Sequence, residues 1–388
     1  MKLLMLLSRF PYPLEKGDKL RAFQHIQMLS SKYELHLIAL SDTAVNDKQL
    51  EALRPYCASI KVIRLNPVTL IFNLIAAFIK RLPLQVGYFH NKSIEKEIIK
   101  VAARLKPEVV FCQLIRTALY GKVVDAQVKI IDYQDAFSAG TKQRLNDAPA
   151  LMKPLFRREL KLVRQFEEES FRWFRKHLVI SDSDRKQLAI TDSKSIVILP
   201  NGVRIQEQLS DSADKSIDVL FVGNMQYRPN VDAATFLVKE IMPFVWKKLP
   251  EASVTLCGAD PSSEVRKLES SLVQVTGWVE NVEVYYKKAK VFVAPMRIGT
   301  GLQNKLLEAF AAGLPVITTP LSATPLSGLQ DEDYLVSNSA GSFAENIVRL
   351  LTDSALRTRV GTNGNRLVRQ KFSMQAVQEE LLAFMEAK

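Results

Sequence analysis

The residues with the clearest chemical signature lie between Arg297 and Glu308, in the string RIGTGLQNKLLE. Two glycines are followed by two amides and a lysine, after which an apolar helical pattern begins. Glycines let a backbone approach a ligand closely. The start of a helix carries free N–H groups and partial positive charge, which attract phosphate. With the cations of Arg297 and Lys305 beside it, the string predicts a phosphate-binding loop.

The expected contacts of this loop fall into two groups. The residues nearest the phosphates are Gly299, Gly301, Leu302, Gln303 and Asn304, and the helix is expected to begin near Gln303. Glu308 lies four residues past Asn304, so both side chains point to the same side of the helix. A carboxylate repels phosphate but accepts hydrogen bonds from ribose hydroxyls. The pattern favours a sugar nucleotide, and the alternative is an ordinary helix cap in a glycine-rich turn.

Short apolar runs alternate with helical patterns along the whole chain. In the first half the runs are KLLMLLS, ELHLIAL, KVIRL, EVVFCQ, VKIIDY, HLVIS and IVILP. The rhythm restarts in the second half with DVLFVG, SVTLCG, VQVTG, VFVAP and PVITTP. Continuous apolar runs of this length are typical of parallel strands buried on both faces. The sequence therefore predicts an α/β protein with two doubly wound, Rossmann-like domains facing across a cleft.

The predicted join between the domains lies at the turn Pro200-Asn201-Gly202, which a polar stretch without periodicity follows. We expect one domain over residues 1–200 and the other over residues 201–374. Residues 375–388 carry the pattern of an amphipathic C-terminal helix.

Positive charge is concentrated in the first half of the chain. Residues 1–200 contain 33 Lys and Arg against 20 Asp and Glu, whereas the whole chain carries a net charge of +12. This imbalance predicts an anionic partner for the first half, such as a membrane surface or a phosphorylated substrate, or it simply favours solubility. The basic residues are scattered and form no recognised module, so no nucleic-acid partner is expected.

Residues 68–81, VTLIFNLIAAFIKR, point more directly to a membrane. Apolar side chains recur there at helical spacing, and two cations follow them; the residues are Leu70, Ile71, Leu74, Ile75, Phe78, Ile79, Lys80 and Arg81. Such a helix is typical of contact with an anionic membrane surface, and the alternative is a helix that faces the core. No run reaches the roughly 20 apolar residues that span a bilayer. We expect a cytoplasmic protein, with peripheral contact to the inner face of the plasma membrane as a hypothesis.

Other common sites are not indicated. The three cysteines, Cys57, Cys112 and Cys257, are far apart and are expected to be free thiols. Four histidines without close pairing give no metal site. Neither a Walker motif nor GxGxxG occurs, which argues against ATPases and dehydrogenases.

The opening string also resembles the donor-site motif of the GT-B glycosyltransferases, in particular family four, the retaining enzymes of polysaccharide and lipid-linked sugar synthesis. The likeness extends through FVGNMQYRPNVDAATFLVKEIMP, TGWVENVEVYYKKAKVFVAPMR, ILPNGV and FPYPLEKGDKLRAFQHIQMLS. It is greatest to bacterial sugar transferases of exopolysaccharide clusters. The resemblance implies transfer from a nucleotide-diphosphate sugar to a hydroxyl of a saccharide or lipid-linked acceptor. It also implies retention of configuration, and neither a metal nor another cofactor.

The resemblance assigns donor contacts in the second half of the chain. It implies that Gly223 and Asn224 meet the diphosphate through their backbone N–H groups and that Arg228 adds a charge. It places Trp278 and Val279 at the nucleotide base, with plain packing as the alternative for Trp278. Lys305 and Arg297 would be the catalytic cations, which stabilise charge on the leaving group.

In the first half, the resemblance implies that the turn at Gly17 touches the donor phosphates. Asp18 is expected to cap the following helix, and Arg21 could face the cleft. Asp135, just after the strand VKIIDY, would orient or deprotonate the acceptor hydroxyl, with a turn-forming aspartate as the alternative. The C-terminal helix would cross back onto the first domain.

The sequence departs from the family pattern at Thr300. Many members carry a glutamate there, and Glu308 matches the second glutamate of their motif. Because of this departure, an alternative function remains: the protein could be a non-catalytic subunit that binds a nucleotide sugar or serves as a scaffold. A sugar-nucleotide epimerase of the same architecture is a further alternative, but the acid and base residues it needs are not found.

Overall fold

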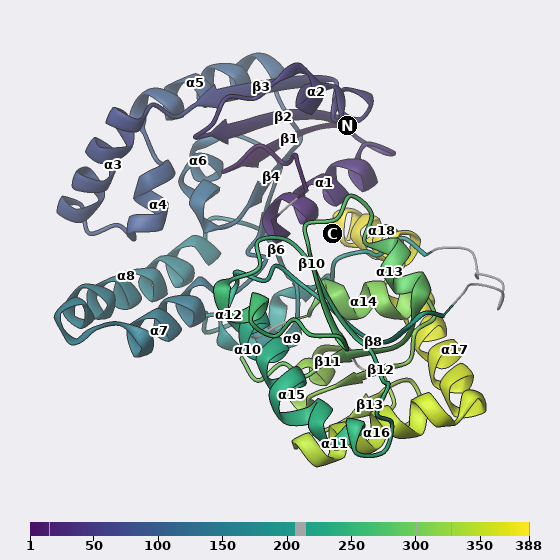
Figure 1. Ribbon diagram of the computed structural model, residues 1–388. Helices are drawn as coiled ribbons and strands as arrows, with labels where there is room; N and C mark the ends of the chain where they lie inside the picture. The colour runs from purple at the N-terminus through teal and green to yellow at the C-terminus, as the bar shows by residue number, and fades with distance from the viewer. Residues whose placement is uncertain (15, 206–214, 299–301, 327, 388) are drawn as a thin grey trace. The chain divides into compact units, whose positions relative to one another are not determined.

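The computed structural model describes residues 1–388 except 15, 206–214, 299–301, 327 and 388 (Figure 1). The chain divides into two compact units. The first comprises residues 1–200 and 378–388, and the second comprises residues 201–377. Each unit has its own parallel sheet and its own apolar core, so each is described separately.

The first unit is built on a seven-stranded parallel sheet of order β3-β2-β1-β4-β5-β6-β7. The strands are β1 (Lys2–Leu7), β2 (Glu34–Ser41), β3 (Ser59–Arg64), β4 (Val109–Gln113), β5 (Val128–Asp132), β6 (Lys176–Val179) and β7 (Val197–Ile198). Every apolar run expected in the first half is a strand. The central strands are buried on both faces, as their unbroken apolar sequences require.

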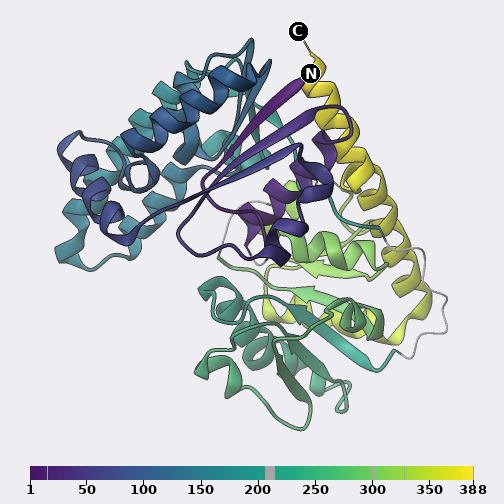
Figure 2. The ribbon, with the colours of Figure 1, turned by 90° about the horizontal axis from the view of Figure 1, so that it is seen from above.

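Helices cover both faces of this sheet. They are α1 (Gly17–Leu29), α2 (Asp47–Glu51), α3 (Pro67–Ile79), α4 (Leu84–Phe89), α5 (Lys92–Leu105), α6 (Ala118–Val123), α7 (Phe137–Asp147), α8 (Lys153–Phe171) and α9 (Asp182–Gln187). Figure 2 shows α1, in purple, and α5, in blue, on opposite faces. The prediction that Asp18 caps α1 is wrong, because the helix begins at Gly17 and Lys16 precedes it.

The last helix, α18 (Met374–Glu386), begins in the second unit and joins the first from Gln378 onward. The Gln378 amide donates to the carbonyl of Met28 at the end of α1, at 3.3 Å, and Figure 2 shows α18, in yellow, beside α1. The ammonium of Lys176 donates to the carbonyls of Phe384 and Met385, at 2.8 and 2.9 Å. A cation at the carboxyl end of a helix satisfies carbonyls that have no partner in the helix.

The second unit is built on a six-stranded parallel sheet of order β10-β9-β8-β11-β12-β13. Its strands are β8 (Ile217–Val222), β9 (Val254–Cys257), β10 (Val273–Gly277), β11 (Ala289–Ala294), β12 (Val316–Thr318) and β13 (Leu335–Val336). The five expected runs are all strands. The sequence did not reveal β13, because two residues are too few to show a period.

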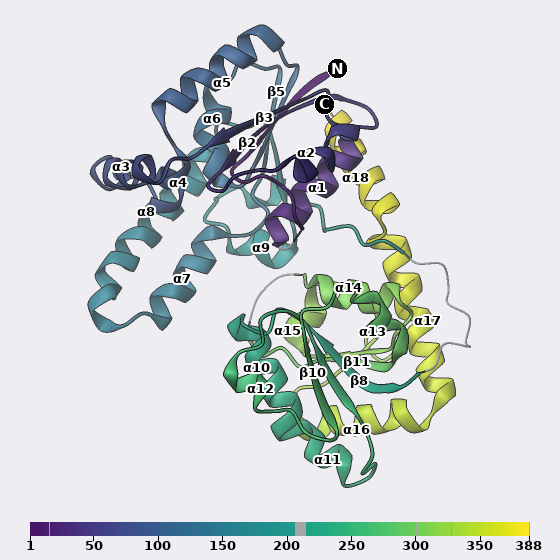
Figure 3. The same cartoon turned by 45° about the horizontal axis from the view of Figure 1, so that its top comes forward.

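The helices of the second unit are α10 (Arg228–Phe236), α11 (Met242–Trp246), α12 (Ser263–Arg266), α13 (Glu283–Lys288), α14 (Asn304–Ala311), α15 (Pro320–Ala323), α16 (Ala340–Thr352) and α17 (Ser354–Lys371). Figures 1 and 3 show α10 and α11 on one face of the sheet and α13 and α14 on the other. This is the doubly wound arrangement that the strand–helix alternation predicted.

A buried ion pair holds the carboxyl end of the first sheet together. The guanidinium of Arg21 donates from Nε and Nη2 to both oxygens of Asp132, at 2.6 and 3.0 Å. Its Nη1 donates to the carbonyl of Leu199, at 2.8 Å. Both ionic side chains are fully buried, so the expectation that Arg21 faces a cleft is wrong. Burial lowers the pKa of the adjacent His25 to about 3, so that ring adds no second cation.

We predict that Arg21→Met destabilises the first unit by about 3–5 kcal/mol, because it leaves the Asp132 carboxylate buried without a counter-ion. Chemical denaturation would measure the loss. The control is Lys186→Met, which removes one partner of an exposed pair with Asp182 and should cost less than about 1 kcal/mol. Equal, small losses in both variants would contradict the structural role of Arg21.

Candidate functional site

The strand order of the second sheet locates its candidate site. The chain leaves β8 toward β9 on one side and later returns to β11 on the other side, so β8 and β11 are neighbours at the point where the order reverses. Ligands of open α/β sheets bind beyond the carboxyl ends of the strands at this point. The two segments that follow these strands, residues 223–228 and 295–305, contain most of the predicted donor contacts.

The segment after β8 makes a tight turn that depends on glycine. A Cβ atom on Gly223 would come within 2.7 Å of the side-chain amide of Asn230, and one on Gly258 would come within 1.8 Å of the carbonyl oxygen of Gly223. The side chain of Asn224 accepts a hydrogen bond from the backbone N–H of Gln226, at 2.9 Å. The side chain of Asn224 is therefore used to shape the turn.

Lys305, in the first turn of α14, links the two segments. Its ammonium donates to Oδ1 of Asn230, at 2.5 Å, and lies 4.7 Å from the centre of the Phe221 ring. Asn230 in turn donates to the carbonyl of Asn224, at 2.9 Å. Among the described residues no carboxylate lies within ion-pair distance of this ammonium. Burial lowers the pKa of Lys305 to about 7, although Glu308 opposes the shift. The site thus holds a half-buried cation without a counter-ion.

Glu308 lies one turn further along α14. Its Oε2 accepts a hydrogen bond from the hydroxyl of Tyr286, at 3.0 Å. Within the described part of the chain its other oxygen has no hydrogen-bond partner. Burial raises the pKa of Glu308, while Tyr286, on α13, is almost fully buried and fixes the carboxyl group in place. Sequence reasoning missed Tyr286, because nothing in the run EVYYKK distinguishes a core tyrosine from a positioning one.

Arg297 is turned toward α10. Its guanidinium donates to both oxygens of Asp232, at 3.0 and 2.7 Å, and lies 4.3 Å from the centre of the Phe236 ring. The hydrogen bond with Asp232 raises the pKa of Arg297. These contacts give Arg297 a structural role, which is to hold the segment after β11 against α10. Its catalytic role stays a prediction.

Three of the six consecutive residues of the predicted loop can be located. Gly299, Thr300 and Gly301 lie outside the described residues. Leu302 packs against the core of the unit. The amide of Gln303 donates to the hydroxyl of Ser322, at 3.0 Å, and Oδ1 of Asn304 accepts from the amide of Asn201, at 3.2 Å. The helix begins at Asn304, and none of the described side chains caps its first turn.

The proposed base contacts lie after β10. Trp278 is 72% exposed, so plain packing, the alternative for this residue, is wrong. Its neighbour Val279 is half-buried against the core. A large exposed ring beside the carboxyl end of a strand is available for stacking. Tyr227, which precedes α10, is exposed as well, and so is Arg228 at the start of that helix.

The first unit has a corresponding reversal point, between β1 and β4. A small hollow lies there, lined by Ser8, Arg9, Asp18, Lys19, Gln113 and Leu114. Asp18 pairs with Arg9, at 3.0 Å. Leu114 has a φ of 65°, a strained value for a residue with a side chain, and such strain clusters at functional sites. A Cβ on Gly17 would meet no atom within 4 Å, so packing does not require glycine there.

Asp135 follows β5 and is solvent-exposed. Loss of water around the carboxyl group raises its pKa to about 7; the Asp184 carboxylate adds to the shift and Arg116 opposes it. Contact with water should moderate this shift. An upward shift favours general base catalysis, and this role of Asp135 stays a prediction.

Arg116 was missed by sequence reasoning. It lies between the rings of Phe89 and Phe137, about 5 Å from each centre. Its Nη2 donates to the Gln85 side chain, whereas Nε and Nη1 are buried without hydrogen-bond partners. Burial lowers its pKa to about 10. The signal was present, because Arg116 is the only charged residue in the apolar stretch FCQLIRTALYG.

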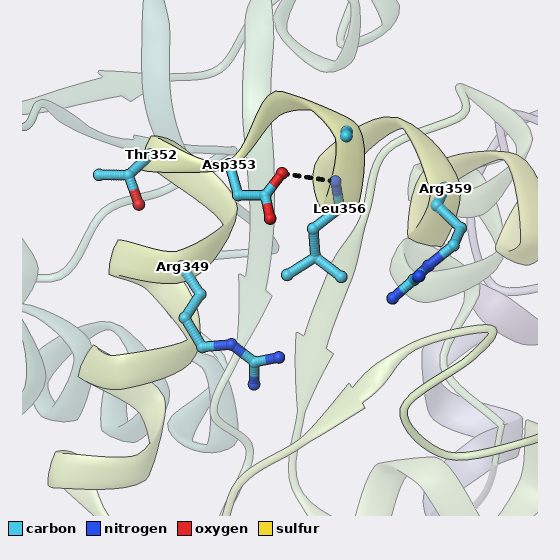
Figure 4. A pocket seen from close by; sticks show the side chains of 6 residues that line it. Arg349, Thr352, Asp353, Leu356 and Arg359 are labelled. Atoms are coloured by element: carbon cyan, nitrogen blue, oxygen red, sulfur yellow. Dashed lines mark hydrogen bonds between the residues drawn. The ribbon is translucent and has the colours of Figure 1, made fainter.

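A surface hollow of about 420 Å³ lies elsewhere, at the junction of α16 and α17 (Figure 4). The Asp353 carboxylate accepts from the backbone N–H of Leu356, at 2.9 Å, and so caps α17. The arginines in Figure 4, Arg349 and Arg359, come from these two helices and not from strand ends. We therefore place the site at the strand ends. The described residues contain no group of three or more His, Cys, Asp or Glu side chains suited to a metal ion.

Part of the chain matches a known protein family. Residues 216–353 match the family Glycosyl transferases group 1. The chain is 22% identical to an uncharacterised 44.6 kDa protein in the cps region of Klebsiella pneumoniae, over 97% of each chain. It is 34% identical to the capsular polysaccharide biosynthesis glycosyltransferase CapM of Staphylococcus aureus, over 25% of this chain and 26% of CapM.

Among solved structures, Anabaena HepE in complex with UDP superposes with a TM-score of 0.70 at 11% identity and covers 99% of both chains. At this identity the likeness shows the fold alone. The chain thus carries a glycosyl transferases group 1 domain, and its fold is that of the GT-B glycosyltransferases.

Proposed function

We propose that the protein transfers a sugar from a nucleotide-diphosphate sugar to a hydroxyl of a saccharide or lipid-linked acceptor in bacterial polysaccharide or glycolipid synthesis. One observation carries the proposal above all. Lys305 lies at the strand reversal of the second sheet and has no counter-ion among the described residues. One helical turn away is Glu308, one of whose oxygens has no partner among those residues. The similarity to CapM and the cps-region protein supports the polysaccharide context.

The diphosphate would lie against Lys305 and the start of α14. An ammonium that is partly withdrawn from water gains more from an anionic ligand than an exposed one does, because solvent screens it less. The uncapped first turn of α14 adds N–H groups and the positive end of the helix dipole. UDP in the structure of HepE is consistent with a nucleotide at this kind of fold.

The ribose would lie against Glu308. Tyr286 holds one carboxylate oxygen, which leaves the other to accept a hydrogen bond from a ribose hydroxyl. Trp278 is exposed where a base could stack on it. Trp278 follows β10, whereas Lys305 and Glu308 follow β11. The bound nucleotide would therefore extend across the carboxyl ends of β9 and β8, which lie between those two strands.

In the proposed reaction the bond from the sugar's anomeric carbon to the diphosphate breaks, and a bond to the acceptor oxygen forms on the same face. The acceptor's proton passes to an oxygen of the leaving phosphate, so configuration is retained and no protein nucleophile is needed. Lys305 would stabilise the negative charge that develops on the diphosphate, in place of a metal ion. Asp135 would orient the acceptor hydroxyl.

The first test is donor binding by wild type and two variants. We expect one nucleotide-diphosphate sugar of a panel to raise the melting temperature by about 5 °C or more at 100-fold excess over its Kd. Lys305→Ala should weaken that binding about 10- to 100-fold and Glu308→Gln about tenfold, since each loses a charge-assisted hydrogen bond.

The matched control is Glu345→Gln, which changes an exposed glutamate on α16 and should bind the donor normally. Product formation is then assayed with the same donor. Binding without any transfer to saccharide or lipid-linked acceptors would favour the non-catalytic alternative. If no donor shifts the wild-type protein, the proposed site is wrong.

The pKa of Lys305 predicts the pH dependence of donor binding. Only the protonated ammonium attracts diphosphate, and this cation is lost as the pH rises through about 7 in the empty site. The diphosphate of a nucleotide sugar does not itself titrate between pH 6.5 and 9. We expect affinity to fall across this range by up to about tenfold per pH unit, as measured by calorimetry. A pH-independent affinity in the wild type, or the same slope in Lys305→Met, would contradict the role of Lys305.

A comparison of Arg297→Ala with Asp232→Ala distinguishes the two roles of Arg297. If Arg297 only holds its segment against α10, both substitutions should change donor affinity equally and by less than about fivefold, and their effects should not add. If Arg297 contacts the donor, as the sequence predicted, only Arg297→Ala should weaken binding strongly. Calorimetry with the donor identified above gives the answer.

A further inference from the structure

The α3 helix of the first unit exposes one continuous apolar face. Its outward side chains are between 52% and 74% exposed; they are Val68, Ile71, Phe72, Ile75, Phe78 and Ile79. They recur three or four residues apart, which places them along one side of the helix. The face differs from the predicted stripe, because Leu70 is buried and Leu74 half-buried, whereas Val68 and Phe72 are exposed.

The opposite side of α3 is firmly attached to the unit. Ala77 packs closely on Gly87 of α4: a Cβ atom added to Gly87 would lie 2.1 Å from the Cβ of Ala77. The Asn73 amide donates to the carbonyl of Tyr88, at 3.2 Å, and its oxygen accepts from the amide of Asn91, at 3.1 Å. The helix is thus held in place with its apolar face outward. Soluble proteins rarely leave so many neighbouring large apolar side chains exposed without a partner for them.

The charge around this face has a single sign. Residues 52–94 contain no Asp or Glu, and they contain six Lys and Arg. Lys80 and Arg81 directly follow the helix. Arg158, from the first part of α8, lies 4.0 Å from the ring centre of Phe78 and donates to its carbonyl. The nearest acid on α8, Glu159, is buried and accepts from the backbone N–H of Leu84, so it does not face outward.

We infer that the apolar face of α3, with Lys80, Arg81 and Arg158, is a docking surface for an anionic lipid membrane. Thirteen helical residues span roughly 20 Å, which is too short to cross a bilayer. Among the described helices none is long and apolar enough to do so. A helix of this kind lies in the interface, with its apolar side chains at the acyl boundary and its cations among the headgroups.

Charge argues against a second copy of the chain as the occupant. In a symmetric dimer the same patch meets itself, and residues 52–94 of a second copy would offer no carboxylate to pair with Lys80 and Arg81. An anionic lipid surface instead satisfies both the apolar face and the cations. Docking is independent of the donor site; only its purpose, to bring the active site to a membrane-anchored acceptor, rests on the proposed function.

The test is co-sedimentation of the full chain with vesicles of phosphatidylcholine alone or mixed with phosphatidylglycerol. We expect binding to the anionic vesicles that falls as salt rises. Phe72→Ser with Ile75→Ser, and separately Lys80→Glu with Arg81→Glu, should each weaken binding about tenfold or more. Both pairs are on the surface, so the melting temperature should change little.

The matched controls lie in the second unit. Arg266→Glu with Lys267→Glu reverses two adjacent exposed cations, and Phe244→Ser removes an exposed ring; both should leave vesicle binding unchanged. No binding of the wild type to anionic vesicles, or equal losses in the control variants, would overturn the inference. So would a dimer in solution that Phe72→Ser with Ile75→Ser dissociates. Donor binding, measured in parallel, should be unaffected in every variant and so separates a failed docking surface from a failed donor site.

Discussion

The candidate donor site depends on the parallel pairing of β8 with β11. This pairing aligns Val219 with Val291 and Leu220 with Phe292, so the segments that leave the two strands emerge side by side. The hydrogen bonds from Lys305 to Asn230 and from Asn230 to Asn224 then join one segment to the other. A slip of the register would separate the cation from the turn that it contacts. Glycine is needed at 223 because the Asn230 side chain lies against it, and at 258 because the backbone of Gly223 does.

The electrostatics of the site differ from those of the rest of the fold. Arg21 is buried with both oxygens of Asp132 as its counter-ion, and Arg297 is held by Asp232. Lys305 is held by an amide oxygen and faces an aromatic ring, with no carboxylate as close. Its lowered pKa reflects the energetic cost of that arrangement in the empty protein. A site that is unfavourable without ligand and favourable with it is expected where a diphosphate binds.

The two units differ in the functional features that they carry. The second unit carries the residues proposed to bind the nucleotide. It also contains the residues that match the glycosyl transferases group 1 family. The first unit carries the excess positive charge, the exposed face of α3 and the strained strand end at Leu114. Arg116 lies among phenylalanine rings, 4.0 Å from a carboxylate oxygen of Asp18, and two of its nitrogens have no hydrogen-bond partner among the described residues.

The sequence by itself determined the fold class, because apolar runs such as VVFCQ and VFVAP can be buried on both faces only in parallel sheets covered by helices. It also determined the candidate donor loop, because Gly, Gln, Asn, Lys and Glu between residues 299 and 308 are local in the chain. Only the tertiary structure decided which cationic side chains remain available to bind a ligand. Arg21 and Arg297 are paired with carboxylates 111 and 65 residues away, whereas Lys305 is not. It likewise revealed Tyr286 beside Glu308, and which side of α3 faces outward. Pairing over such separations depends on how strands are ordered in a sheet, and local periodicity carries no record of that order.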